Sequence, residues 1–141
     1  MEWTGPDGFW ISDDRSRIDV LKVHRWLSVE SYWAKGRSFD TVARSIEGSI
    51  TLGLFDAAGT QVGVCRWVTD CATFAWLCDV FVDAGFRGRG LGAFLVRTAT
   101  EHPSVRDLRL RVLATTDAHP LYRRFGFTPL AAPERWMEHR H

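Results

Sequence analysis

The feature that most constrains the fold is a glycine-rich stretch between an apolar run and a helical pattern. Residues 78–99 read CDVFVDAGFRGRGLGAFLVRTA, with an apolar run that ends at Val82 and glycine at positions 88, 90 and 92. Glycine loses more conformational entropy on folding than any other residue, so its repeated use indicates that the backbone itself is needed. Backbone N–H groups at a helix N-terminus are a common seat for an anion. The stretch therefore predicts a strand, an anion-binding loop and a helix, in that order.

The rest of the chain predicts a single mixed α+β domain over residues 1–141. Apolar residues at helical spacing indicate helices over 19–30, 40–48, 91–101 and 118–125. Apolar and alternating runs indicate strands over 9–14, 49–56, 61–69, 73–83, 107–113 and 126–130. Residues 31–38 show no period, so we expect a loop there. The connection from the 73–83 strand through a helix to the 107–113 strand is expected to be a parallel crossover.

Composition disfavours several kinds of partner. The chain has 18 basic and 17 acidic side chains, so it lacks the charge that recruits nucleic acid or an anionic membrane. The cysteines, Cys65, Cys71 and Cys78, have no CxxC spacing and indicate neither a metal site nor a disulfide framework. The first residues do not combine a basic segment with an apolar one, so we expect no signal peptide and a cytoplasmic protein.

The glycine loop also satisfies a second pattern. Residues 88–93 match G-x-G-x-x-A, a weak form of the dinucleotide-binding fingerprint. That fingerprint expects an acidic residue about 20 positions later, where this chain has Arg111 and Val112. Too few residues follow for the further strand–helix–strand units of such a fold. A third alternative is a glycine turn that only allows the helix to pack closely, but such a turn needs neither three glycines nor two arginines.

Two motifs together resemble those of the GCN5-related N-acetyltransferases, the GNAT family. Residues 87–92, RGRGLG, resemble the R/Q-x-x-G-x-G/A signature, and residues 118–127, AHPLYRRFGF, resemble A-x-x-L-Y-x-x-x-G-F. The resemblance covers residues 49–130, whereas residues 1–48 match only as a strand and two helices. It implies a mixed, mostly antiparallel sheet flanked by helices and splayed between its fourth and fifth strands, here 73–83 and 107–113.

The resemblance implies acetyl-CoA as the cofactor. Successive N–H groups of the loop would face its pyrophosphate at the positive end of the helix, and the end of the 73–83 strand would pair with its pantetheine arm. The family often has asparagine seven positions before the motif tyrosine, where this chain has Thr115, so that contact is expected to be weaker or replaced. The predicted cofactor-binding residues are Val80, Phe81, Val82, Arg87, Gly88, Arg89, Gly90, Leu91, Gly92, Ala93 and Thr115.

Acetyl transfer to an amine needs a base, a seat for the oxyanion and a proton donor for the leaving thiolate. Asp79 lies in an apolar strand where many family members have glutamate, so we predict that it acts as the base, through a water because aspartate is shorter. The alternative places Asp79 on the solvent face of the strand. Tyr122 is the predicted acid, or a hydrogen-bond donor to the sulfur, rather than a packed helix residue. The oxyanion would take the N–H of Phe81 or Val82.

Aromatic residues in irregular segments indicate where the acceptor binds. Tyr32, Trp33 and Trp136 are predicted to line its cleft, because aromatic faces attract a cationic or flat group. Alternatively, these rings cover the edge of the core. We interpret the chain as an acetyl-CoA-dependent N-acetyltransferase whose acceptor is the primary amine of a small molecule that attacks directly. The alternative is a non-catalytic acyl-CoA-binding or sensing domain. We expect no metal, nucleic acid or membrane partner, and a homodimer is compatible with the sequence.

Overall fold

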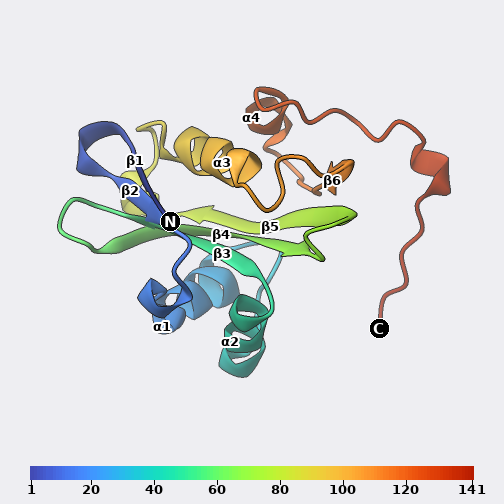
Figure 1. Ribbon diagram of the computed structural model, residues 1–141. Coiled ribbons are helices and arrows are strands. Elements are labelled where there is room, and N and C mark those ends of the chain that lie inside the picture. Colours follow the sequence, from blue (N-terminus) through green and yellow to red (C-terminus); the bar gives the residue numbers. More distant parts are fainter.

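One mixed sheet runs through the whole molecule (Figure 1). The computed structural model describes residues 1–141. The strands follow chain order across the sheet: β1 (Glu2–Thr4), β2 (Trp10–Ser12), β3 (Ile50–Phe55), β4 (Gln61–Thr69), β5 (Phe74–Val82) and β6 (Leu110–Val112). Neighbouring strands are antiparallel except for β5 and β6, which are parallel. The expected parallel crossover is therefore confirmed.

Helices cover both faces of the sheet (Figure 1). They are α1 (Val20–Arg25), its π-helical continuation η3 (Trp26–Glu30), α2 (Phe39–Glu47), α3 (Leu91–Glu101) and α4 (His119–Arg123). Short 3₁₀ turns are η1 (Pro6–Gly8), η2 (Arg15–Arg17), η4 (Ala84–Phe86) and η5 (Pro133–Arg135). The side chains of Asp19 and Ser38 begin α1 and α2 by accepting hydrogen bonds from the first turn. None of these helices has the length and apolar character that a membrane span requires.

Two separate apolar clusters hold the layers together. On the α3 side, Trp67 and Leu95 are buried, and the Trp67 indole N–H donates to the carbonyl of Ala99 at 3.0 Å. On the α1 and α2 side, Trp26 stacks on Phe81 with ring centroids 5.5 Å apart. Both faces of the central strands are thereby buried, which explains why β3 and β4 read as continuous apolar runs.

A bulge in β5 and the divergence of β6 together open the sheet. The register of β4 against β5 shifts between Val64 and Arg66, and Asp79 of β5 has a φ of 53° at this point. The β5–β6 pairing covers only Phe74 to Trp76. Beyond Trp76 the edge of β5 that faces β6 has no strand partner, which confirms the predicted splayed sheet.

Most predicted elements are present, with two differences. The 91–101 helix is confirmed with its predicted bounds, and the other helices and the strands up to 113 lie within a few residues of the prediction. Strand β1 was not predicted, because three residues are too short to show alternation. The strand predicted for 126–130 is wrong. Pro129 has no N–H to donate there, and a cavity separates this segment from β6.

Candidate active site

A cavity of about 480 Å³ lies where β5 and β6 diverge. Its walls come from the loop after η3, the end of β5, the glycine loop with the start of α3, and α4 with the residues before it. The structure brings most of the predicted site residues to this cavity: Tyr32, Trp33, Val80, Phe81, Val82, Arg87, Gly88, Gly90, Leu91, Gly92 and Tyr122. Five other predicted residues do not line it: Asp79, Arg89, Ala93, Thr115 and Trp136.

The glycine loop offers a row of unpaired backbone donors. Gly88 and Gly90 have φ values of 80° and 76°, in the left-handed region that favours glycine. A Cβ added at either position would meet nothing within 4 Å, so the space beside the loop is open. No hydrogen bond within the protein uses the N–H of any residue from 88 to 93. These donors lie at the N-terminus of α3, where the helix dipole favours negative charge.

The two arginines of the loop are placed differently. The Nε–H of Arg87 donates to the carbonyl of Val82 at 3.0 Å, and its guanidinium lies 5.2 Å from the ring centroid of Phe81. Arg87 therefore stands at the cavity wall with most of its donors free. The guanidinium of Arg89 lies over the ring of Phe86 at 5.3 Å, and Arg89 does not line the cavity. The loop thus brings one of its two positive charges to the cavity wall.

Tyr122 belongs to α4 and lines the same cavity as the end of β5. The residue is 8% exposed, and no hydrogen bond within the protein uses its hydroxyl. Burial raises the pKa of Tyr122 to about 12, with smaller contributions from Cys65, Tyr32 and Asp117. The hydroxyl therefore keeps its proton at neutral pH and can donate a hydrogen bond to a group in the cavity.

Asp79 lies behind the cavity wall as the centre of a buried ionic cluster. Its Oδ2 accepts from Arg66 Nε at 2.6 Å and from Arg37 Nη1 at 2.9 Å. Its Oδ1 accepts from the indole N–H of Trp33 at 2.9 Å. Both carboxylate oxygens are therefore engaged by donors within the protein, so neither is free to take a proton from an amine. The base role of Asp79 stays a prediction that these contacts disfavour.

The 31–38 loop is tied to the rest of the molecule on two sides. Trp33 is held by Asp79, while the hydroxyl of Tyr32 accepts from the backbone N–H of Thr116 at 3.0 Å. This hydrogen bond lowers the pKa of Tyr32. The two rings meet edge to face with centroids 5.0 Å apart. Tyr32 and Trp33 thus form one aromatic wall between the ionic cluster and the segment before α4.

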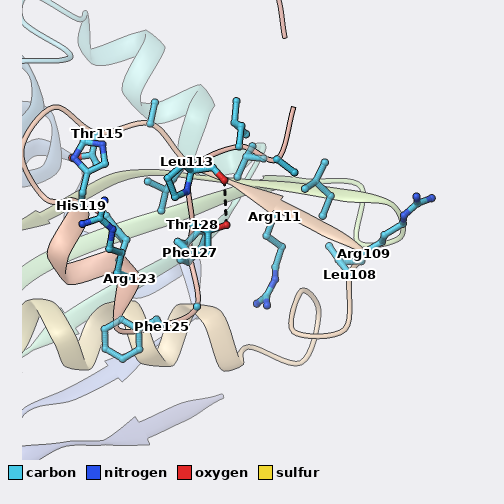
Figure 2. Close-up of a pocket in the computed structure, with 18 residues that line it drawn as sticks. Leu108, Arg109, Arg111, Leu113, Thr115, His119, Arg123, Phe125, Phe127 and Thr128 are labelled. Atoms are coloured by element: carbon cyan, nitrogen blue, oxygen red, sulfur yellow. Dashed lines mark hydrogen bonds between the residues drawn. The ribbon is translucent and has the colours of Figure 1, made fainter. Parts of the chain in front are cut away.

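Two predicted residues lie elsewhere. The hydroxyl of Thr115 accepts from the N–H of Ala118 at 3.2 Å, so it shapes the turn into α4. Thr115 lines a second cavity of about 710 Å³, on the other side of α4 (Figure 2). Trp136 lies in the C-terminal segment, 44% exposed, and lines neither cavity. The structure therefore does not bring Thr115 or Trp136 to the glycine loop.

Sequence reasoning missed some members of the site. Asp117 and Glu30 also line the cavity, and neither is among the site residues predicted above. Arg37 and Arg66 were not singled out. Their partner Asp79 is 42 and 13 residues away in the chain, so no local pattern could reveal the pairs. The structure contains no cluster of His, Cys, Asp and Glu side chains that could hold a metal ion.

Comparisons with known proteins agree with this geometry. The family model described as "Acetyltransferase (GNAT) domain" matches residues 48–129. A crystal structure from Xanthomonas campestris, described as a "putative acetyltransferase belonging to the GNAT family", is 42% identical, with a TM-score of 0.92, and the match covers 97% of this chain and 96% of that one. A Gibberella zeae protein described as a "putative acetyltransferase" is 28% identical over 86% of this chain and 79% of its own length. Glucosamine-6-phosphate N-acetyltransferase from Arabidopsis thaliana, at 14% identity and a TM-score of 0.65, shares the fold over 94% of this chain and 97% of its own.

Proposed function

Since the chain belongs to the GNAT family of acetyltransferases, we propose that it transfers the acetyl group of acetyl-CoA to the primary amine of a small molecule by direct attack. The observation that carries this proposal is the row of unpaired N–H groups from 88 to 93, which opens on the same cavity as the Tyr122 hydroxyl. The N–H groups suit a pyrophosphate, and the Tyr122 hydroxyl suits a leaving thiolate. Both are needed by a reaction that uses acetyl-CoA.

The residues present fit acetyl-CoA. The space beside Gly88 and Gly90 is open, and Arg87 adds a positive charge at the wall. The unpaired edge of β5 at Val80–Val82 offers backbone groups to the amides of the pantetheine arm. We therefore assign the phosphates to the glycine loop and the arm to β5, so that the thioester lies between β5 and Tyr122.

Tyr122 is assigned to the sulfur as a hydrogen-bond donor. Its pKa of about 12 lies well above that of a thiol, about 8.5 for cysteine, so complete proton transfer to a thiolate is uphill. A hydrogen bond from the hydroxyl still stabilises the charge that develops on sulfur as the thioester breaks. Of the two predicted roles of Tyr122, we therefore propose the hydrogen-bond donor to sulfur rather than the acid that gives up its proton.

The acceptor amine is assigned to the side of the cavity formed by Tyr32 and Trp33. Glu30 and Asp117 line the same cavity and can attract an ammonium group and take up its proton. Asp79 cannot easily do so, because both its oxygens are engaged. We assign Asp79 instead a positioning role, because it holds the indole of Trp33 and the guanidinium of Arg37, both from the 31–38 loop.

A coupled assay of CoA release tests this function. Purified protein with acetyl-CoA is exposed to a panel of small primary amines, and matching tertiary amines serve as controls. Release that requires a primary amine, with a mass gain of one acetyl group on the amine, is the expected result. Tight binding of acetyl-CoA without release for any amine would instead favour a non-catalytic acyl-CoA-binding domain. A melting temperature that saturating acetyl-CoA does not raise would contradict the cofactor assignment.

A further inference from the structure

The active-site cavity contains two carboxylates that the protein itself leaves unpaired. Glu30 lines the cavity from the end of η3, and Asp117 lines it from the segment before α4. Both residues are exposed, and neither takes part in an ion pair of the protein. The only basic residue in the lining is Arg87, which belongs to the glycine loop. Away from that loop, the cavity therefore offers two acidic side chains and no basic one.

A hydroxyl in the same cavity also lacks a partner. Tyr122 is 8% exposed, and no hydrogen bond within the protein uses its hydroxyl. Every fully buried side-chain nitrogen and oxygen of the protein has a hydrogen-bond partner, so this hydroxyl reaches the open space of the cavity. Polar groups of residues as buried as this one usually have a partner within the protein, so its absence points to a ligand. The two carboxylates thus line a space in which an independent group already indicates a polar ligand.

Asp117 lies at the end of the cavity where we place the thioester. The N–H of Thr116, the residue before it, donates to the hydroxyl of Tyr32 at 3.0 Å, which ties this segment to the aromatic wall. Burial raises the pKa of Tyr122 to about 12, and the charge of Asp117 contributes to that rise. Asp117 is therefore within electrostatic reach of the hydroxyl that we assign to the CoA sulfur.

Glu30 reaches the cavity from a different element. It ends the π-helical turn η3, after which the N–H of Ser31 donates to the carbonyl of Trp26 at 2.9 Å. Such π-helical turns are rare and occur frequently at functional sites. The hydroxyl of Ser31 also donates to the carbonyl of Leu27 at 2.7 Å, which fixes the direction of the chain beyond Glu30. Glu30, unlike Asp117, does not contribute to the raised pKa of Tyr122, so we place it farther from the thioester.

We propose that the acceptor is a diamine, whose reacting amine binds at Asp117 and whose second ammonium group binds at Glu30. This inference rests on the proposed transfer to a primary amine and names the chemical class of that amine. Two positive charges on the ligand complement the two carboxylates, and the faces of Tyr32 and Trp33 attract the same cations. An acceptor that carries a carboxylate in place of the second amine would instead meet a like charge at Glu30.

Only the reacting nitrogen changes in the transfer. Its ammonium group gives one proton to Asp117, from which the proton passes to solvent. The neutral amine then forms a C–N bond with the acetyl carbon as the C–S bond breaks, and the excess proton on nitrogen ends on the CoA sulfur. The product keeps one positive charge where the substrate had two. It therefore binds more weakly than the diamine, and we expect a single acetylation.

A comparison of matched amines tests the substrate class. CoA release is measured with 1,4-diaminobutane, 1-aminobutane and 4-aminobutanoate, and then with diamines from 1,3-diaminopropane to 1,6-diaminohexane. We expect the KM of the best diamine to lie roughly 5-fold or more below that of the monoamine of equal length, since even an exposed ion pair can change binding by about that factor. Mass spectrometry should show the singly acetylated product. A monoamine KM equal to or below that of every diamine would overturn the proposal.

Variants of Glu30 test the site of the second ammonium group. Glu30→Gln should reduce the preference for 1,4-diaminobutane over 1-aminobutane about 5-fold. Glu101→Gln, at an exposed carboxylate of α3 that does not line the cavity, should leave this preference unchanged. Glu30→Lys should reverse the choice of charge, so that 4-aminobutanoate is preferred over the diamine. An unchanged preference in both Glu30 variants would overturn the proposal.

Calorimetry separates this inference from the proposed function. 1,4-Diaminobutane and 1-aminobutane are each titrated into the protein saturated with CoA, which requires no turnover. If the diamine binds more tightly, and Glu30→Gln removes the difference, the site is supported even where no amine is acetylated, and only the proposed function is then wrong. If monoamines and diamines are acetylated with equal KM, the transfer stands and the diamine site is wrong. Failure of the diamine to bind the CoA complex also contradicts the proposal.

Discussion

The two sides of the active-site cavity are built from different kinds of group. On the proposed cofactor side, the glycine loop and the β5 edge offer main-chain groups, held in place by the loop's own dihedral angles. On the proposed acceptor side, Tyr32 and Trp33 depend on side-chain contacts with Asp79 and with the segment before α4. A main-chain surface depends on few side chains, so it suits a constant ligand. A side-chain surface can vary with the ligand, which suits the acceptor.

The largest expected effect comes from a substitution in the glycine loop, which supplies the main-chain donors. Gly90→Asp forces a side chain into a residue with φ of 76° and puts a like charge beside the phosphates. Charge-assisted hydrogen bonds are worth about 1.5–3 kcal/mol each, so losing two or more should weaken acetyl-CoA binding at least ~10²-fold by calorimetry.

Gly59→Asp separates this loss from backbone strain. Gly59 lies between β3 and β4, with a φ of 87° and no atom within 4 Å of an added Cβ, so it carries the same strain far from the cavity. Both variants should lose about 1 kcal/mol of stability. Only the Gly90 variant should lose binding. Equal affinity in the two folded variants would place the phosphates away from the glycine loop.

The next largest effect comes from a substitution that removes the side-chain contacts behind Tyr32 and Trp33. Asp79→Asn leaves Arg37 and Arg66 without a negative partner, and loss of one member of a buried ion pair typically costs 3–5 kcal/mol, roughly. We expect lower stability in urea unfolding, and in the protein that remains folded a raised acceptor KM. Acetyl-CoA affinity should hardly change, because the loop keeps its own geometry.

Asp79→Glu distinguishes positioning from base catalysis. A longer carboxylate would improve reach if Asp79 removed the proton, so turnover would hold or rise. If Asp79 positions Trp33, the longer side chain displaces the indole and the acceptor KM rises while turnover at saturation holds. A pH–rate profile that loses its acidic limb in Asp79→Asn would restore the base role.

How far the sequence could predict the site follows the same division. The glycine loop and the 91–101 helix depend on the spacing of residues close together in the chain, so the sequence was enough to predict both. The role of Asp79 depends on a φ of 53° in a bulge and on arginines brought in by β4 and the 31–38 loop. No local pattern encodes that meeting. The predicted 126–130 strand failed for a similar reason, because strand pairing requires a partner that local alternation does not specify.

A smaller effect tests Tyr122, which lines the same cavity as the glycine loop and the two aromatic residues Tyr32 and Trp33. Tyr122→Phe removes only the hydroxyl, which has no partner within the protein, so stability should be unchanged. Turnover should fall about 10²-fold with acetyl-CoA affinity preserved, because the hydrogen bond acts on charge that develops only in the transition state.

Burial raises the pKa of Tyr122 to about 12, and the donor is the protonated form, so wild-type turnover should not fall from loss of this proton below about pH 11. Unchanged turnover would reduce Tyr122 to a packing role.

The smallest expected effect tests whether Trp33 contacts the acceptor. Trp33 is 40% exposed, lines the cavity with one part of its indole and donates to Asp79 with its N–H. A cation over an indole face gains about 0.5–2 kcal/mol, so Trp33→Ala should raise the KM of a cationic amine roughly 2- to 30-fold. Trp33→Phe keeps a ring but loses the hydrogen bond, and should give an intermediate KM.

Trp76→Ala is the matched control, because Trp76 is 42% exposed on β5 and does not line the cavity. It should change neither the acceptor KM nor acetyl-CoA affinity. The alternative is that Trp33 only covers the edge of the core, in which case Trp33→Ala would lower the melting temperature and leave KM unchanged. If KM instead rises for a cationic amine but holds for a neutral one of similar shape, the indole recognises charge. If it rises equally for both, Trp33 contributes a flat apolar surface, and the selectivity for amines must come from Glu30 and Asp117.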